Sequence, residues 1–227
     1  MALPSFRAAA LRRREQHPNL IAAWGFDEGT GSTARDSSEH NLPLSISGGV
    51  TWVTGHSGGT ALANSGSGGA IRANWTSLSV PTTIMCWAKP TDLTAGTSRA
   101  LIGVWSGTDT TSSTQFAIWA QRGDFSTSNV LQGNVRVDNG LVAVNHTALA
   151  LNTWVHVALS FDGTTIRLFR DGIEVSAFSI TGGITGGTYN FLVVPSTTNA
   201  QVDDVRVFNA ALTAAQVASF MGDPVAP

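Results

Sequence analysis

The chain has 227 residues, of which 42% are hydrophobic and only 12% are charged. This composition allows a buried core and excludes wholesale disorder. The formal net charge of -2 argues against nucleic acid as a partner, because a domain that binds nucleic acid is normally basic. Length alone fits either one large β domain or two small ones.

The first 18 residues differ in composition from everything that follows. We expect a short helical arm over residues 5–16, which Ser5 can cap and which Pro18 ends. Its arginines form either a solvated face or a docking surface for a partner. The docking alternative involves Arg7, Arg12, Arg13 and Arg14. The short apolar part precedes the arginines, so the segment does not fit a signal peptide. No stretch approaches the roughly 20 apolar residues that span a bilayer.

From Leu20 onward, short apolar runs alternate with clusters of Gly, Ser, Thr and Asn, which predicts an all-β domain. The Asp-Gly pairs at 162–163 and 171–172 each separate two strand-like runs. Asp-Gly favours the tight turn of a hairpin, so residues 153–175 should form a three-stranded antiparallel meander. Many strands without a long helix between them indicate a two-sheet sandwich. We therefore divide the chain into an arm (1–18), one β domain (19–222) and a tail (223–227).

Seven tryptophans are candidates for the core or for ligand contact. Trp24, Trp87 and Trp154 lie within apolar runs and are expected in the core. Trp75, in a polar stretch, and Trp105, at a strand end, are the best candidates for exposure. An exposed indole can stack on the C–H face of a sugar, although packing in the core or at its rim is the alternative for both residues.

Near the C-terminus, a predicted strand over residues 202–208 contains two adjacent acids, Asp203 and Asp204. Side chains alternate faces along a strand, so the two carboxylates should point in opposite directions. Asp204 is expected at the surface beside Arg206, and Asp203 could cap a turn. A helix should follow, because Thr213 and Gln216 form a capping box.

The five histidines show no spacing typical of a zinc site, and His156, which alternates with apolar residues, is expected to be structural. The single cysteine, Cys86, lies in an apolar run and is expected to be a buried thiol.

Five segments in the same order resemble the laminin-G-like, concanavalin A-like domains. They are LIAAWGFDEGTGSTARDSS, TGHSGGTALA, TIMCWAKP, NTWVHVALSFDGTTIRLFRDGIEV and VDDVRVFNAALTAAQV. The resemblance spans residues 20–220 and implies an antiparallel jelly-roll sandwich. Members of this family are mostly non-enzymatic modules that bind glycans or proteins, often with a structural calcium ion. By this resemblance Asp203 occupies the place of a calcium ligand, and Asp27 should lie near it because the first and last strands are neighbours.

Some relatives with this fold are glucanases, which carry their catalytic acids in a Glu-x-Asp-x-x-Glu strand. The four glutamates here, Glu15, Glu28, Glu39 and Glu174, do not form that pattern. We therefore expect no enzymatic activity and treat a hydrolase as the least favoured alternative.

The resemblance, the arm and the absence of a signal peptide together predict a lectin-like module on a virion surface, such as a bacteriophage minor tail protein. In this prediction the chain is made in the host cytoplasm, the arm docks to virion structural proteins, and the sandwich binds host-surface glycan. The alternative is an architectural capsid decoration protein without a sugar ligand. A homo-oligomer fits either prediction, and neither involves nucleic acid or membrane insertion.

Overall fold

The structure is a computed structural model. It describes residues 17–76, 78–94, 96–107, 114–121, 130–138, 140–180, 182–184, 187–196 and 198–226. The predicted N-terminal helix and its arginines Arg7, Arg12, Arg13 and Arg14 lie outside these residues, so the arm stays a prediction. No helix in the described part of the chain is long and apolar enough to cross a membrane.

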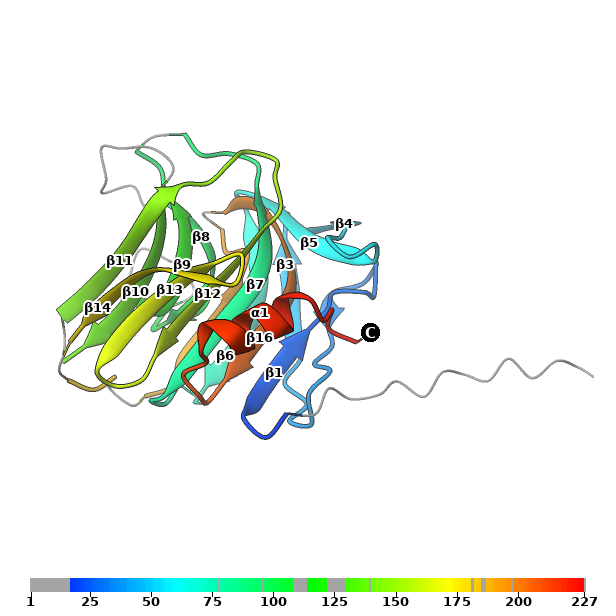
Figure 1. Cartoon of the computed structure of the whole chain (residues 1–227). Coiled ribbons are helices and arrows are strands. Elements are labelled where there is room, and N and C mark those ends of the chain that lie inside the picture. The colour runs from blue at the N-terminus through cyan, green and yellow to red at the C-terminus, as the bar shows by residue number, and fades with distance from the viewer. Residues whose placement is uncertain are drawn as a thin grey trace, which may run out of the picture.

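The described residues form two antiparallel sheets that face each other (Figure 1). Sheet A runs in the order β14-β13-β12-β7-β16-β5-β4, with β1 paired to β16. Its strands are β1 (Leu20–Trp24), β4 (Thr51–Thr54), β5 (Thr60–Ser65), β7 (Thr82–Pro90), β12 (Val155–Phe161), β13 (Thr165–Arg170), β14 (Ile173–Ser179) and β16 (Asn199–Phe208). Sheet B runs in the order β11-β10-β9-β8-β15-β6-β3-β2. Its strands are β2 (Thr33–Ala34), β3 (Leu44–Gly48), β6 (Gly68–Trp75), β8 (Arg99–Trp105), β9 (Thr114–Gln121), β10 (Val130–Val137), β11 (Gly140–Ala148) and β15 (Tyr189–Val193).

The predicted all-β, two-sheet jelly-roll sandwich is confirmed, and so is its meander. Strands β12, β13 and β14 pair in sequence as two antiparallel hairpins. At the second turn Asp171 and Gly172 have φ of 50° and 78°, the left-handed values that an Asp-Gly turn supplies. In the first turn the Asp162 carboxylate accepts the backbone N–H groups of Thr164 and Thr165, both at 2.8 Å.

The main core lies between the sheets and is built from the inward side chains of both. Trp24 is fully buried there, and its ring stacks on Phe191 with centroids 5.3 Å apart. Cys86 is also fully buried, as expected, and burial raises the pKa of its thiol. Apolar burial on this scale is the main source of stability for such a sandwich.

Helix α1 (Ala214–Met221) lies across the outer face of sheet A (Figure 1). Its capping box is formed as predicted: the Thr213 side chain accepts the Gln216 N–H, and the Gln216 side chain accepts the Thr213 N–H. Val217 packs with outward side chains of the sheet such as Phe169 and Phe208. Arg206 of β16 is buried and donates to the carbonyl oxygens of Phe220 (3.3 Å) and Asp223 (2.5 Å), which fixes the end of the helix to the sheet.

Replacing Thr213 by alanine should lower the free energy of unfolding by about 1 kcal/mol, because two first-turn N–H groups depend on the capping box. Urea denaturation followed by far-UV circular dichroism measures the change. Thr213→Ser, which retains the hydroxyl oxygen, is the matched control and should stay near wild type. Equal losses in the two variants would contradict the role of the cap.

Candidate functional site

The two tryptophans predicted to be exposed are both buried. Trp75 is 2% exposed and Trp105 is 0% exposed. Trp75 turns into the main core, where its ring lies 5.1 Å from that of Phe191. The reason is strand pairing. Strand β6 lies between β3 and β15, so the Trp75 side chain points inward although its neighbours in the sequence are polar. The prediction that these rings face solvent is therefore wrong for both residues.

Trp105 nevertheless lies on the outer face of sheet B, away from the main core. Its ring meets that of Trp119 edge to face, with centroids 6.1 Å apart. The two indoles pack with the small residues Ala100 and Ala117 and with Leu192, all outside the main core. We call the outward side chains of β8, β9 and β10 the sheet B face.

Amide side chains continue this face on β10. Gln132 pairs with Trp119 in the strand register, and Asn134 pairs with Ala117, so both side chains point to the same side as the indoles. Both are fully buried. The Gln132 Nε2 donates to the Asn145 Oδ1 at 2.7 Å, and Asn145 is exposed on the neighbouring edge strand β11. A row of amides thus leads from the solvent-exposed edge to the buried part of the face.

Several polar atoms of the sheet B face have no hydrogen-bond partner among the residues that the structure describes. They are the Trp105 Nε1, the Gln121 Oε1, the Gln132 Oε1 and both polar atoms of the Asn134 side chain. A buried polar atom left without a partner costs about 1–3 kcal/mol, so such atoms are rare in native proteins. Their concentration on one face is the feature expected of a surface that receives polar groups from a ligand or from ordered water.

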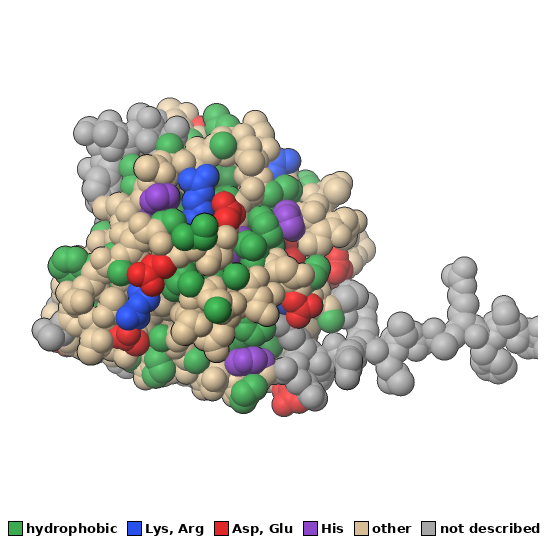
Figure 2. Space-filling model, viewed as in Figure 1, with side chains coloured by type: hydrophobic (Ala, Val, Ile, Leu, Met, Phe, Trp, Pro, Cys, Tyr) green, Lys and Arg blue, Asp and Glu red, His purple; other side chains and the backbone are tan. Residues whose placement is uncertain are grey.

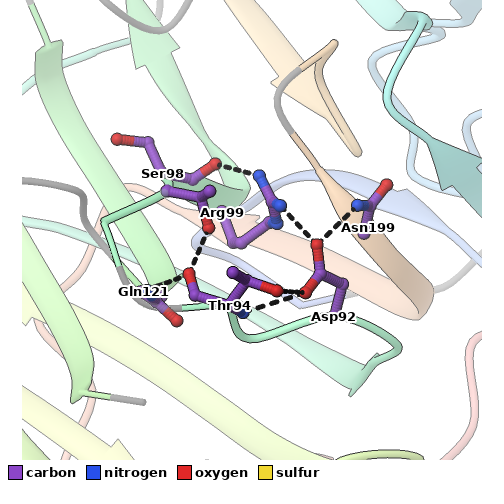
Figure 3. Close-up of polar contacts among 7 residues, drawn as sticks. Asp92, Thr94, Ser98, Arg99, Gln121 and Asn199 are labelled. Carbon is purple, nitrogen blue, oxygen red and sulfur yellow. Dashed lines mark hydrogen bonds and ion pairs between the residues drawn. The ribbon is translucent and has the colours of Figure 1, made fainter. Parts of the chain in front are cut away.

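A polar network fixes one end of this face (Figure 3). Asp92 accepts hydrogen bonds from Thr94, forms an ion pair with Arg99, and accepts the Asn199 Nδ2 at 2.9 Å. These bonds to Thr94, Arg99 and Asn199 hold the pKa of the Asp92 carboxyl well below its usual range. The Gln121 Nε2 donates to the Thr94 carbonyl at 2.6 Å, which orients the amide, and its Oε1 has no partner in the described part of the chain.

The predicted metal residues, Asp27 and Asp203, come together beside the pairing of β1 with β16. They line one pocket with Gly25, Ser57 and Gly59. The expectation that first- and last-strand acids are neighbours is confirmed.

Asp204 lines the same pocket, contrary to the prediction that the two adjacent acids point in opposite directions. The register of β16 shifts between Asp203 and Arg206, and Asp204 has a φ of 48°, so a bulge breaks the alternation of faces. Asp204 is 5% exposed, and its Oδ1 accepts the Val225 N–H at 2.9 Å. The prediction that Asp204 is a surface residue is therefore wrong.

The Asp203 carboxylate is fixed by two backbone N–H groups. Its Oδ2 accepts the His56 N–H at 2.8 Å, and its Oδ1 accepts the Asp204 N–H at 2.9 Å. Burial, then the charge of Asp204 and more weakly that of Asp27, raises the pKa of Asp203 to about 7 against the opposing effect of the two hydrogen bonds.

The donors at this corner are hard oxygens, the type that calcium prefers. Within the described residues, however, no three acidic, histidine or cysteine side chains lie close enough to hold a metal ion. A cation here would therefore need backbone carbonyl oxygens and water to complete its shell, which calcium accepts.

The sequence prediction missed the amides Gln121, Gln132 and Asn134. In β10, Gln132 and Asn134 alternate with inward apolar residues such as Leu131 and Val135, which is the pattern of any strand with one solvated face. The available signal was that amides stand where a solvated strand more often carries charged residues. That signal is too weak to select them from sequence alone.

A laminin G family model, described as the concanavalin A-like lectin/glucanases superfamily, matches residues 64–218. No curated protein sequence matches the chain. Among solved structures, domain 4 of AbnA, an extracellular GH43 arabinanase from Geobacillus stearothermophilus in complex with arabinotriose, is similar at 19% identity and a TM-score of 0.68. The match covers 89% of this chain and 98% of that domain.

Two toxin binding domains are also similar. That of Paraclostridial Mosquitocidal Protein 1 matches at 16% identity and a TM-score of 0.67, over 88% of this chain and 51% of the other. That of botulinum neurotoxin serotype C1 matches at 15% identity and a TM-score of 0.65, over 90% of this chain and 52% of the other. The chain thus spans about half the length of these toxin domains. The structural likeness establishes the fold, and the family match covers most of the chain. The chain therefore belongs to the concanavalin A-like lectin/glucanases superfamily.

Proposed function

We propose that this protein is a non-enzymatic, lectin-like module that binds glycan on the sheet B face. The observation that carries the proposal is the group of buried polar atoms without partners on Gln121, Gln132, Asn134 and Trp105. Amides both donate and accept hydrogen bonds, as sugar hydroxyls do, so a glycan that reached the buried Asn134 side chain would satisfy both of its polar atoms at once.

The neighbouring indoles add the second element of sugar recognition. Trp105 and Trp119 form an apolar wall beside the amides, and ligand sites commonly combine such a wall with a few placed polar groups. The exposed Asn145, bonded to Gln132, gives a ligand its first polar contact at the open edge of the sheet. No ionised group is needed for these contacts, so we propose a neutral glycan.

The relatives are compatible with this function. The arabinanase domain was solved with arabinotriose, and cell entry of botulinum neurotoxin type C is described as dependent on two ganglioside molecules. The absence of a Glu-x-Asp-x-x-Glu strand favours binding over hydrolysis. The virion location, its structural-protein partners and the decoration alternative stay predictions from the sequence, because neither the fold nor the family bears on them.

We also propose a structural calcium ion at the corner formed by Asp27 and Asp203. The support is the juxtaposition of Asp27, just after the first strand, with Asp203 on the last strand and Asp204 in the same pocket. A bound cation would offset the repulsion that the buried carboxylates exert on one another. It would stabilise the closure of the sandwich and lies at a different corner from the amides.

A glycan array probed with the full chain, followed by calorimetry on the neutral glycans that bind, tests the proposed function. Asn134→Ala and Gln132→Ala should each weaken binding at least about tenfold. The melting temperature of Asn134→Ala should stay near wild type, because the Asn134 side chain makes no hydrogen bond with the described residues that the substitution could remove. Ser45→Ala, an exposed position on the distant strand β3 of the same sheet, should bind as wild type does.

Two results would contradict the proposal: no binding to any glycan on the array, or unchanged binding by both amide variants. The array should be run with calcium present, so that loss of the cation cannot cause a negative result.

A further inference from the structure

A ridge of aromatic rings crosses the outer face of sheet A, on the opposite side of the sandwich from the sheet B face. It consists of Trp87 on β7, Trp154 just before β12, and His56 between β4 and β5; we call these three residues the aromatic ridge. The imidazole of His56 stacks on the indole of Trp87 with centroids 3.5 Å apart and planes 14° apart. Trp154 meets His56 edge on at 5.8 Å. All three side chains are half-buried.

Helix α1 covers the neighbouring outward side chains but leaves the ridge partly open. Met85, Phe169 and Phe208 are fully buried beneath the helix and the segments next to it. Trp87 and Trp154 belong to no buried cluster and keep part of their surface in solvent. Figure 2 shows this side of the molecule, on which hydrophobic and histidine side chains adjoin at the surface.

The rings are held in place by the backbone around them. The Trp87 Nε1 donates to the Met221 carbonyl oxygen at 3.4 Å, and the His56 N–H donates to Asp203. His156, directly across the strand pair from Trp87, packs edge to face against it at 5.4 Å. Because these contacts fix the rings before any ligand arrives, binding would cost little conformational entropy.

Lys89, the only lysine of the chain, stands at the end of the ridge. Its Nζ lies 6.0 Å from the centroid of the Trp154 ring. Every ion pair recorded among the described residues uses an arginine, and no carboxylate there lies within ion-pair distance of Lys89. The ammonium group is therefore available to an anionic group of a ligand.

We propose that the aromatic ridge and Lys89 form a second ligand site, which binds a carboxylated sugar. The indole of Trp154 would stack on the C–H face of the sugar ring, and the ammonium of Lys89 would pair with the carboxylate. A single lysine is too little charge for a polyanion such as nucleic acid, whose binding requires several cations. The combination of aromatic face and one cation fits a sugar acid, and the proposal stands independently of the neutral-glycan site on sheet B.

Oligogalacturonate and its methyl ester provide the test, because esterification removes the charge of each carboxylate and adds only a methyl group. Sialyllactose with lactose gives a second pair that differs by one acidic sugar. Binding is measured by titration of the indole N–H signals in ¹H–¹⁵N NMR spectra. We expect the wild-type chain to bind at least one acid at least about tenfold more tightly than its neutral counterpart, with shifts at Trp87 and Trp154.

Trp154→Ala should abolish this binding, and Lys89→Gln should remove the preference for the acid. Trp52→Phe, a half-buried tryptophan on β4 outside the ridge, is the matched control and should bind as wild type does. Asn134→Ala on sheet B should also leave acid binding unchanged, which separates the two sites. The proposal is overturned if neither acid binds, if acid and neutral forms bind equally, or if Trp154→Ala retains binding.

Discussion

In EDTA, the free energy of unfolding of the wild-type protein is expected to fall as the pH rises from about 4 to about 7, through the titration of Asp203. Burial and the charge of Asp204 raise the pKa of this carboxyl to about 7, whereas its usual value is 3.8. The folded chain therefore holds this proton more tightly than the unfolded chain does. The resulting stabilisation is complete below pH 3.8 and is lost as the pH approaches 7. At about 1.4 kcal/mol per pKa unit, the loss from this residue amounts to roughly 4 kcal/mol.

Asp203→Asn should remove that pH dependence, because the amide does not ionise. Urea denaturation at a series of pH values measures the difference between the wild-type and variant slopes, which isolates this residue from the other acids. Asp223→Asn, on an exposed residue after helix α1, is the matched control and should retain the wild-type slope. Parallel curves for wild type and Asp203→Asn would show that Asp203 titrates alike in both states.

The same variant tests the proposed calcium ion. At pH 8 Asp203 is ionised, so saturating calcium should raise the melting temperature of the wild type by several degrees. Asp203→Asn should show no such response, since the amide offers a cation a weaker oxygen ligand. An equal rise in both proteins, or no rise in the wild type, would contradict a calcium site at this residue.

Local signals in the sequence were sufficient to predict the hairpin turns and the first turn of helix α1. An Asp-Gly pair and a capping box act through neighbouring residues, so the β12–β14 meander and the first turn of α1 form as predicted. The family resemblance supplied the long-range arrangement, including the pairing of β1 with β16.

The errors arose where burial depends on distant segments. Trp75 is buried because β15 brings Phe191 against it, and a bulge between β16 and β7 turns Asp204 into the pocket of Asp203. Neither contact has a counterpart in the local sequence. The amides of β10 show the same limit: alternation places Gln132 and Asn134 on the outer face, but their complete burial there does not follow from it.

At acid pH the wild-type protein should lose stability through His156, with a sign opposite to that of Asp203. Burial, then the charges of Arg206 and His56, lowers the pKa of this imidazole to about 3 from its usual 6.5. Between these two pKa values, His156 therefore binds a proton in the unfolded chain but not in the folded chain. The stabilisation is complete above pH 6.5 and is lost as the pH falls toward 3, by about 1.4 kcal/mol per unit and roughly 5 kcal/mol in total.

His156→Gln should flatten the acid limb of the stability profile, because the amide does not ionise. The His156 Nδ1 has no hydrogen-bond partner in the described part of the chain, so the replacement removes no hydrogen bond from that atom. Urea denaturation between about pH 7 and about pH 4 measures the effect. His146→Gln, on the edge strand β11, is the control and should follow the wild-type profile. An NMR titration midpoint near 6.5 for the His156 ring would contradict the prediction, because a folded chain that binds this proton as readily as the unfolded chain gains no stability from excluding it.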